Sequence, residues 1–324
     1  MKNVTVDILM STFNGEQFIC EQIDSIIHQT YAHWKLIIRD DGSTDTTVKI
    51  INEYVLNYPE KIELIKNDHE NLGYKKSFLR LLTFSKADYI MFADQDDFWL
   101  PKKIERSLQS ILKEEIKFPE LPILSVTDIA ICNESLTVQI PSYFKDLNVF
   151  KQRNTQFILL ASILHGCSFI FNAKLRNLTI SLFPEKSVDT LIINGHDNLI
   201  SIVAATCGKI VFENDVLMKH RIHHKNQIGY SVTNKPGILE SGKTILKYLF
   251  NNKFYRKFYF ESKIKENKQI LEEIKALNRQ LPYVYDIFLK LEQTSYFKRK
   301  IHNLYYPYVI CPSYRSRVIY ILCF

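Results

Sequence analysis

The chain is poor in the residues that mark fibrous, low-complexity and disulfide-rich proteins. Its 324 residues include only 9 glycines, 10 prolines and 6 cysteines. Such low glycine and proline contents exclude collagen-like repeats and flexible low-complexity scaffolds. The cysteines are Cys20, Cys132, Cys167, Cys207, Cys311 and Cys323. Because none shows C-x-x-C or zinc-finger spacing, we expect unlinked thiols in a reducing compartment.

Long apolar runs are also absent. No stretch approaches the about 18 apolar residues of a membrane-spanning helix, and Val318–Phe324 is far shorter. Val4–Met10 is too brief and too polar for the apolar core of a secretory signal. We therefore expect a cytoplasmic protein that is soluble or peripheral on the inner face of the cell membrane.

Charge is distributed unevenly along the chain. Residues 241–324 carry 16 Lys and Arg against 6 Asp and Glu, a net charge of +10. Because the whole chain has a net charge of +7, residues 1–240 have a net charge of −3. The same tail holds 18 of the 41 aromatic residues. The chain therefore consists of a mildly acidic body followed by a basic, aromatic tail.

The first 115 residues alternate between strand-like and helix-like patterns. The predicted strands are Val4–Met10, Trp34–Arg39, Ile62–Lys66 and Asp88–Ala93, and the predicted helices are Glu16–Gln29, Thr46–Leu56, Asn71–Ser85 and Lys102–Lys113. This alternation predicts an α/β fold with a Rossmann-like, mainly parallel sheet and helices on both faces. Ligands bind beyond the carboxyl ends of the strands in such sheets. Those ends carry Ser11-Thr12, Asp40-Asp41 and Asp94–Asp97.

The second half of the chain is less regular. We predict strands at Ile123–Ile131, Cys167–Phe171, Lys209–Phe212 and Val216–Ile222, and a helix at Asp197–Ala205. Beyond Gly237 the pattern is helical, with an apolar stripe formed by Ile270, Leu271, Ile274, Leu277 and Leu281. A domain boundary is predicted within Asn234–Gly242.

Three carboxylates fall within four residues at Asp94-Gln95-Asp96-Asp97. Like charges this close repel one another and cost stability unless a cation offsets them. Mg²⁺ and Mn²⁺ take oxygen ligands, and often bind through one or two carboxylates together with substrate phosphates. The cluster at a strand end therefore predicts a metal–diphosphate site, although a solvated turn or helix cap would have a similar local sequence.

Five ordered motifs resemble the family 2 glycosyltransferases of the GT-A fold. They are Ser11–Gly15, Asp40–Asp45, Ala93–Pro101, Gly195–Asp197 and Arg221–Asn226. The D-Q-D-D-F-W form of the third motif is especially similar to bacterial rhamnosyltransferase-like members that build surface polysaccharides. The resemblance covers about residues 4–229. It implies metal-dependent, inverting transfer of one sugar from dTDP-rhamnose or a UDP-hexose to a lipid-linked glycan of a capsule, O-antigen or cell-wall polysaccharide.

The resemblance also implies roles for single residues. Its donor-binding positions are Ser11, Thr12, Asn14, Asp40, Asp41, Asp94, Arg221 and His223. Thr12 and Asp41 match positions that hold the pyrimidine base, whose imide N–H a carboxylate can accept. The alternative for Asp40 and Asp41 is a turn and cap. Asp94 matches a contact to ribose or to the water shell of the metal.

The metal and the base are assigned by the same resemblance. Asp96 matches the ligand of Mn²⁺ or Mg²⁺, and Asp94 and His223 match further metal contacts. Asp197 matches the base that takes the proton of the acceptor hydroxyl, although a carboxylate stabilised by a helix N-terminus is the alternative. Zinc is not expected, because no cysteine or acidic residue stands at ligand-like spacing from His220, His223 and His224.

These matches predict a GT-A catalytic domain at residues 1–236, with a nucleotide-binding half at about 1–115 and an acceptor half at about 116–236. Segment 237–324 is predicted to be a helical basic and aromatic extension that contacts an anionic membrane surface. Helices packed on the catalytic domain are the alternative. Nucleic acid is not an expected partner, because no recognised nucleic-acid-binding module accompanies the tail.

A competing motif lies at the predicted boundary. Gly237–Thr244 fits G-x-x-x-x-G-K-[ST], the phosphate-binding loop of P-loop NTPases. That loop should follow a buried strand, whereas Thr233–Pro236 precedes it here. A P-loop NTPase and a non-catalytic membrane-peripheral adaptor therefore stand as the alternatives to a glycosyltransferase.

Overall fold

The computed structural model describes residues 4–65, 71–146, 164–184, 195–223 and 261–276. The chain divides into two compact units. The first comprises Met1–Tyr143 and Leu164–Lys225, and the second comprises Phe144–Ile163 and Asn226–Phe324. The predicted boundary at Asn234–Gly242 lies outside the described residues and stays a prediction.

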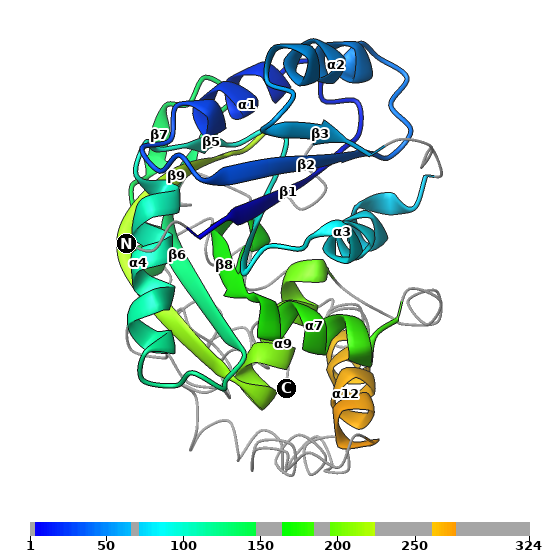
Figure 1. Cartoon of the computed structure of the whole chain (residues 1–324), viewed down its shortest axis with the longest axis vertical. Coiled ribbons are helices and arrows are strands. Elements are labelled where there is room, and N and C mark those ends of the chain that lie inside the picture. Colours follow the sequence, from blue (N-terminus) through cyan, green and yellow to red (C-terminus); the bar gives the residue numbers. More distant parts are fainter. Residues whose placement is uncertain (1–3, 66–70, 147–163, 185–194, 224–260, 277–324) are drawn as a thin grey trace, which may run out of the picture. The chain divides into compact units, whose positions relative to one another are not determined.

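The first unit is built on a mixed sheet with the strand order β3-β2-β1-β4-β8-β6-β9-β5, and β7 pairs with β6 (Figure 1). Its strands are β1 (Val6–Thr12), β2 (Trp34–Asp40), β3 (Ile62–Leu64), β4 (Tyr89–Ala93), β5 (Phe98–Trp99), β6 (Ile123–Cys132), β7 (Val138–Ile140), β8 (Phe169–Asn172) and β9 (Lys209–Arg221).

The described helices are given in chain order, and α12 follows the last strand and belongs to the second unit. They are α1 (Ile19–Ile27), α2 (Thr47–Asn57), α3 (Gly73–Phe84), α4 (Lys103–Glu115), α5 (Tyr143–Asp146), the 3₁₀ turn η2 (Gly166–Ser168), α7 (Ala173–Leu182), α9 (His196–Cys207) and α12 (Glu261–Ala276). No helix in the described ranges has the length and apolar character needed to cross a membrane.

The parallel part of the sheet, β3-β2-β1-β4, is the part that the alternating pattern predicts. β4 is buried along its whole length and β1 at every position except Ser11. Parallel strands need helices on both faces, and their sequences are accordingly near-continuous apolar runs. Figure 1 shows α1 and α2 on one face of this part and α3, α7 and α9 on the other.

The rest of the sheet differs from the prediction in two places. The two predicted strands Lys209–Phe212 and Val216–Ile222 form one strand, β9, which ends at Arg221. Its ladder with β6 shifts register between Thr127 and Asp128. The bulge at this shift accommodates the polar residues that made the pattern look like two strands. Cys167 lies in η2 instead of a strand, and β8 begins only at Phe169.

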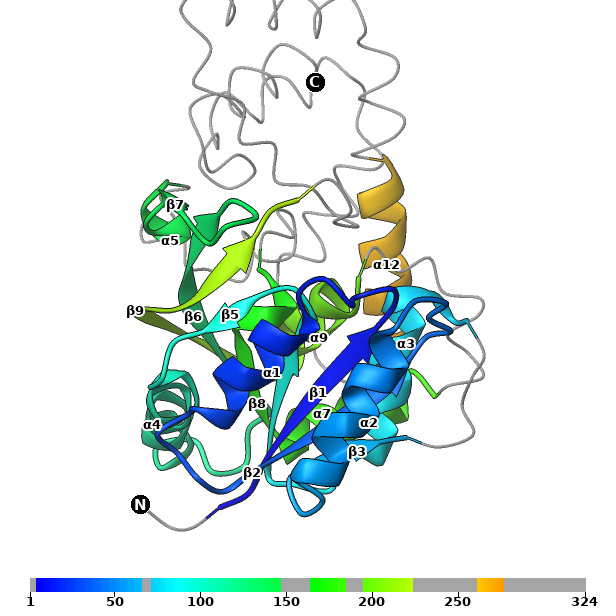
Figure 2. The same cartoon turned by 90° about the horizontal axis from the view of Figure 1, so that it is seen from above.

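Short elements were missed for a physical reason. β5 has two residues and β7 has three, too few to show a period. Figure 2 shows β5 between α1 and β9. The backbone N–H of Trp99 in β5 donates to Ser25 Oγ of α1 at 3.0 Å. This small strand therefore leads the chain from the loop after β4 toward β9.

The predicted tail is described only in α12. Ile270, Leu271 and Ile274 of the predicted stripe lie on this helix and are buried. Leu277, Leu281 and the motif at residues 237–244 lie outside the described residues, as does most of the predicted extension.

Candidate active site

The carboxyl ends of three parallel strands meet at one edge of the sheet. Thr12, the last residue of β1, pairs with Asp40, the last residue of β2. Met10 pairs with Ala93, the last residue of β4. This register brings the loops after β1, β2 and β4 side by side, as the sequence pattern predicts.

Asp40 organises the loop after β2. Its Oδ1 accepts hydrogen bonds from Thr12 Oγ1 at 2.8 Å and Ser43 Oγ at 2.6 Å. Its Oδ2 accepts from the backbone N–H groups of Gly42 at 3.1 Å and Ser43 at 2.8 Å. These four bonds occupy the acceptor sites of an ionised carboxylate. The Asp40 carboxylate therefore stabilises the turn after β2, as the turn alternative describes, and the predicted contacts of Asp40 and Thr12 with the sugar nucleotide stay predictions.

Asp41 has a different environment. Its Oδ1 accepts from Arg39 Nη1 at 2.6 Å and from the Leu72 N–H at 2.8 Å, and its Oδ2 accepts from the Gly73 N–H at 2.8 Å. The carboxylate is buried and faces the start of α3. Three of its about four acceptor sites are used, which leaves one lone pair of Oδ2 for a ligand.

Ser11 and Asn14 are fixed by neighbouring segments. Ser11 Oγ donates to Ser77 Oγ of α3 at 2.6 Å. Asn14 has a φ of 47°, in the left-handed region that Asn tolerates better than most residues. Its Oδ1 accepts from the Thr44 N–H at 2.8 Å. Both predicted donor-binding residues therefore lie in the group of loops at this edge.

Gln95 joins the loop after β4 to the loop after β1. Its Oε1 accepts from the Phe13 N–H at 2.9 Å, and its Nε2 donates to the Phe13 carbonyl at 3.0 Å. A Cβ at Gly15 would lie 2.3 Å from Gln95 Oε1, so only glycine leaves room for this contact. The two loops are therefore held together independently of any ligand.

Asp96 and His223 meet although they are far apart in the sequence. Asp96 Oδ2 lies 2.8 Å from His223 Nε2, and the side chains are 14% and 5% exposed. The His223 ring packs on Phe18 with a centroid distance of 4.8 Å. A carboxylate oxygen suits Mn²⁺, and a neutral imidazole nitrogen is the commonest protein ligand of metal ions. We call Asp96 and His223 the outer pair.

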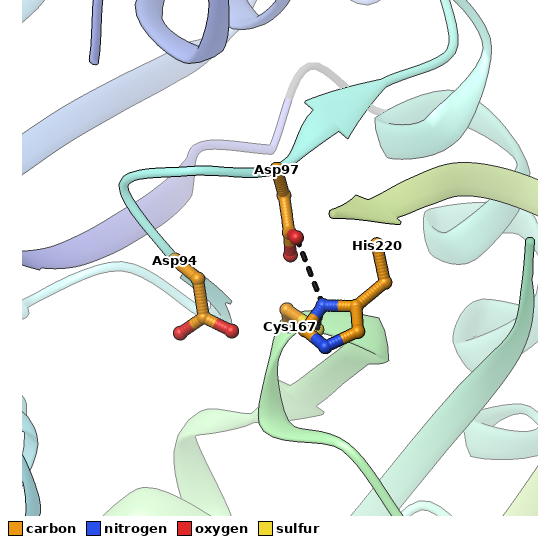
Figure 3. Close-up of side chains that lie close together, drawn as sticks. All are labelled: Asp94, Asp97, Cys167 and His220. Atoms are coloured by element: carbon orange, nitrogen blue, oxygen red, sulfur yellow. Dashed lines mark hydrogen bonds and ion pairs between the residues drawn. The ribbon is translucent and has the colours of Figure 1, made fainter. Parts of the chain in front are cut away.

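A second group of side chains lies at the same edge (Figure 3). The possible ligand atoms of Asp94, Asp97, Cys167 and His220 all lie within 4.8 Å of one another. We call these four residues the inner group. Its closest contact joins Asp97 Oδ1 to His220 Nδ1 at 2.8 Å. The acidic cluster in the sequence already pointed to Asp94 and Asp97, but their grouping with Cys167 and His220 was not predicted, because those two residues come from η2 and β9.

Burial and charge set the protonation of the inner group. Burial, followed by the nearby Asp97 and Asp96 carboxylates, raises the pKa of Asp94 to about 8. Burial also opposes the charge on Asp97, but the adjacent His220 outweighs it and lowers the pKa of Asp97. Burial likewise opposes the charge on His220, but Asp97 raises its pKa to about 9. These shifts favour an Asp97–His220 ion pair and the neutral form of Asp94, which a divalent cation would ionise.

A buried lysine accompanies these carboxylates. Lys103, the first residue of α4, has no exposed surface, and burial lowers its pKa to about 8 despite the opposing effects of Cys167 and Asp97. Its Nζ lies 3.4 Å from Met218 Sδ and 4.8 Å from the centroid of the Trp99 ring. Because nothing local in the sequence marks this lysine as buried, sequence reasoning did not identify it.

Arg221 is directed at protein acceptors. Its Nε donates to the Asp96 carbonyl at 2.8 Å, and its Nη1 and Nη2 bond to the Glu134 carbonyl and the Glu21 carboxylate. The guanidinium carbon lies 4.5 Å from the centroid of the Phe18 ring. Arg221, predicted to contact the sugar nucleotide, therefore links the loop after β4 to α1 and to the segment after β6.

Asp197 lies in the first turn of α9. Its Oδ1 accepts from the Asn198 N–H at 2.7 Å, and its charge contributes to the raised pKa of Asp94. A Cβ at Gly195 would lie 2.2 Å from Asp197 Oδ1, and one at Gly166 would lie 3.3 Å from Asp197 Cβ. The carboxylate thus folds back over a glycine beside the inner group, an arrangement that both the base role and the helix-terminus role allow.

Comparisons with known proteins point to one family of enzymes. Residues 7–122 match the family model described as "Glycosyl transferase family 2". The dTDP-rhamnosyl transferase RfbG of Shigella flexneri is 28% identical over 313 residues, which are 91% of this chain and 96% of that protein. The UDP-Glc:alpha-D-GlcNAc-diphosphoundecaprenol beta-1,3-glucosyltransferase WfgD of Escherichia coli is 32% identical over 118 residues, 36% of this chain and 45% of that protein.

Two solved structures share the fold. Staphylococcus aureus TarS 1-349 in complex with UDP-GlcNAc matches with a TM-score of 0.55 and 14% identity, covering 97% of this chain and 90% of that one. The mannosyltransferase PcManGT from Pyrobaculum calidifontis, in complex with GDP-Man and Mn2+, matches with a TM-score of 0.50 and 14% identity, covering 98% and 85%. At such identities the likeness shows the fold alone.

Proposed function

Because the chain belongs to glycosyltransferase family 2, we propose that it transfers one sugar from a nucleotide-diphosphate sugar to a glycan, with inversion and with the help of a divalent metal ion. The observation that carries this proposal is the convergence of Asp41, Asp94 and the outer pair at one edge of the sheet. Substrates of open α/β folds bind at this edge.

The nucleobase is proposed to meet Asp41. The remaining lone pair of Asp41 Oδ2 would accept the imide N–H of uracil or thymine, and the bonds from Arg39 and Gly73 hold the carboxylate in place. Cytosine presents an acceptor at the same ring position, so this contact discriminates between pyrimidines. Thr12 supports the pocket through Asp40.

This role predicts a preference for UDP over CDP. With Mn²⁺ present, we expect UDP to bind about 10- to 100-fold more tightly than CDP, because a hydrogen bond to a charged group contributes about 1.5–3 kcal/mol. The gap should shrink in Asp41→Asn, whose amide can donate to cytosine. Calorimetric titration of both nucleotides measures the gap, and Mn²⁺ affinity and thermal stability show whether the variant is intact. Equal binding of UDP and CDP by the unaltered protein would refute the role of Asp41.

The outer pair is proposed to hold Mn²⁺ or Mg²⁺. Its donors fit the ion, since cis ligands at about 2.1 Å from a metal lie about 3 Å apart, close to the 2.8 Å between Asp96 Oδ2 and His223 Nε2. The inner group fits less well because it includes a thiol, which favours softer ions. When bound, the ion neutralises the diphosphate leaving group. We place Asp94 at the ribose or at the water shell of the ion.

Asp197 is proposed as the base. In an inverting transfer, one carboxylate accepts the proton of the acceptor hydroxyl while the nucleotide diphosphate leaves from the opposite face of the sugar. The position of Asp197 near Asp94 supports this role, since it places the carboxylate close to the proposed donor site. Arg221 is proposed to support the loop after β4 through its bond to the Asp96 carbonyl.

The donor and acceptor are proposed from the relatives. A relative named as a dTDP-rhamnosyl transferase supports dTDP-rhamnose, and one named for UDP-Glc leaves a UDP-hexose as the alternative. The second of these names also contains a diphosphoundecaprenol acceptor, which supports a lipid-linked glycan of a bacterial surface polysaccharide such as a capsule. We therefore place the protein at the inner face of the cell membrane, with the basic tail as its contact.

A thermal-shift screen of nucleotide sugars with Mn²⁺ tests the proposed function. A donor at 100 times its Kd adds about 2.7 kcal/mol of stability, which raises Tm by about 5 °C or more. We expect such a shift with one dTDP- or UDP-sugar and none with ATP. A shift with ATP alone would favour a P-loop NTPase, and the absence of any nucleotide effect would favour a non-catalytic adaptor.

A further inference from the structure

Two contacts join the loop after β4 to the end of β9. The outer pair links Asp96 to His223, and the inner contact links Asp97 Oδ1 to His220 Nδ1, each at 2.8 Å. We propose that Asp97 and His220 are positioning residues that hold Asp96 and His223 at the spacing a metal ion requires. This inference rests on the proposed function, in which the outer pair holds the ion.

The sheet register dictates the inner contact. Phe98 of β5 pairs with Lys219 of β9 in an antiparallel ladder, so one position further along, Asp97 falls opposite His220. Directly opposed residues of an antiparallel pair project to the same face, with Cβ atoms about 5 Å apart. Asp97 and His220 therefore continue the β5–β9 pairing with side chains.

Asp97 also fixes the backbone on both sides of the outer pair. The same Oδ1 that contacts His220 accepts the Arg221 N–H at 3.1 Å. Arg221 Nε in turn donates to the Asp96 carbonyl at 2.8 Å. Asp96 directly precedes Asp97, and His223 follows Arg221 by two residues. Movement of either backbone segment would therefore change the separation of the two outer side chains.

The His220 ring is itself held in place. Cys167 Sγ lies 4.0 Å from His220 Nδ1, and the His165 ring packs on the His220 ring at a centroid distance of 5.3 Å. The Asp97 side chain is 0% exposed and that of His220 is 10% exposed. Removing either partner leaves a buried polar group without its main contact, which costs more than the loss of an exposed pair.

The two oxygens of Asp97 have different surroundings. Oδ1 accepts hydrogen bonds from His220 and Arg221, whereas the buried Oδ2 has no hydrogen-bond partner among the described residues. Cys167, a neighbouring side chain of the inner group, offers a thiol that Mn²⁺ does not favour. We assign the bonds of Oδ1 the role of supporting the outer pair, as hydrogen-bonded partners support metal ligands in many sites. Comparison of Cys167→Ala with Asp97→Ala distinguishes this role from metal binding within the inner group.

Alanine variants of both residues test this inference. In Asp97→Ala and His220→Ala we expect Mn²⁺ to bind about 10- to 100-fold more weakly, measured from the electron paramagnetic resonance signal of free Mn²⁺. The double variant should bind Mn²⁺ no more weakly than the weaker single variant, because both lose the same contact. The donor KM should rise at fixed Mn²⁺, whereas kcat should recover at saturating Mn²⁺. His220→Asn keeps a hydrogen-bond donor near the position of Nδ1, so it should retain most of the Mn²⁺ affinity.

Asp7→Ala provides a matched control. Asp7 is also a buried carboxylate, but it lies near the start of β1, where its Oδ2 accepts from Ser85 Oγ at 2.8 Å and from the Lys86 N–H at 3.0 Å. This variant should lose thermal stability and keep its Mn²⁺ affinity within about twofold of the original protein. If the alanine variants do not fold, the Mn²⁺ affinities of Asp97→Asn and Asp7→Asn can be compared in the same way.

The possible failures can be told apart. The inference is overturned if Asp97→Ala binds Mn²⁺ as tightly as the original protein does. It is also overturned if Cys167→Ala loses as much affinity as Asp97→Ala, because the inner group would then be the ligand set. The proposed function fails instead if the original protein binds neither UDP nor dTDP in the presence of Mn²⁺.

Discussion

Asp197→Asn is expected to lower the kcat of sugar transfer by about 10²- to 10⁴-fold, the usual contribution of a positioned general base. This range corresponds to about 2.7–5.4 kcal/mol of activation free energy. The amide keeps an oxygen that accepts the Asn198 N–H but cannot take a proton from the acceptor hydroxyl. UDP and Mn²⁺ should therefore bind with nearly unchanged affinity, so that kcat falls without a matching loss of binding.

A matched helix-terminal acid separates the base role from a structural one. Glu105 lies in the first turn of α4, where its Oε2 accepts from Thr30 Oγ1 at 2.9 Å. Glu105→Gln removes a similar interaction with a helix N-terminus and should leave kcat unchanged. If kcat of Asp197→Asn stayed within about tenfold, roughly 1.4 kcal/mol, Asp197 would be only a helix-terminal carboxylate.

Removing Asp96, a proposed metal ligand, is expected to abolish activation by Mn²⁺. We expect Asp96→Ala to weaken Mn²⁺ binding by more than about 100-fold, since losing a supporting residue alone costs about 10- to 100-fold. The original protein should lose activity in EDTA and regain it when Mn²⁺ is added. The activity of Asp96→Ala should not return at Mn²⁺ concentrations that restore the activity of the original protein.

Asp215→Asn is a suitable control for the metal experiment. Asp215 also lies on β9, but its carboxylate bonds to Arg106 on the surface, at 2.6 Å from Nη2. Its loss should leave Mn²⁺ affinity unchanged, because an exposed ion pair contributes little. Full activity of the original protein in EDTA, or unaltered Mn²⁺ binding in Asp96→Ala, would contradict the role of the outer pair.

The parallel half of the fold could be predicted because its elements are long and periodic. β1 and β2 are apolar runs, and α1 buries Ile19, Ile23 and Ile26 on one face. Each such element carries its own signal in the sequence. β5 could not be predicted in the same way, because its two residues form a strand only by pairing with β9.

The candidate site also contains residues that the sequence could predict and residues that it could not. Asp96 and His223 could be proposed because both lie in recognisable motifs, and the structure brings them to 2.8 Å. The partnership of Asp97 with His220 could not, since these residues are 123 positions apart and are joined by strand register. The burial of Lys103 is equally invisible, because tertiary packing and not the local sequence encloses it.

Inverting transfer can be tested through the anomeric configuration of the sugar that the protein releases when water replaces the acceptor. Nuclear magnetic resonance can follow the first product from the donor found in the thermal-shift screen, before the free sugar equilibrates. Our account predicts Mn²⁺-dependent release of the sugar with the configuration opposite to that of the donor, and strongly reduced release by Asp197→Asn. Release with retained configuration, or at an unchanged rate in Asp197→Asn, would contradict it.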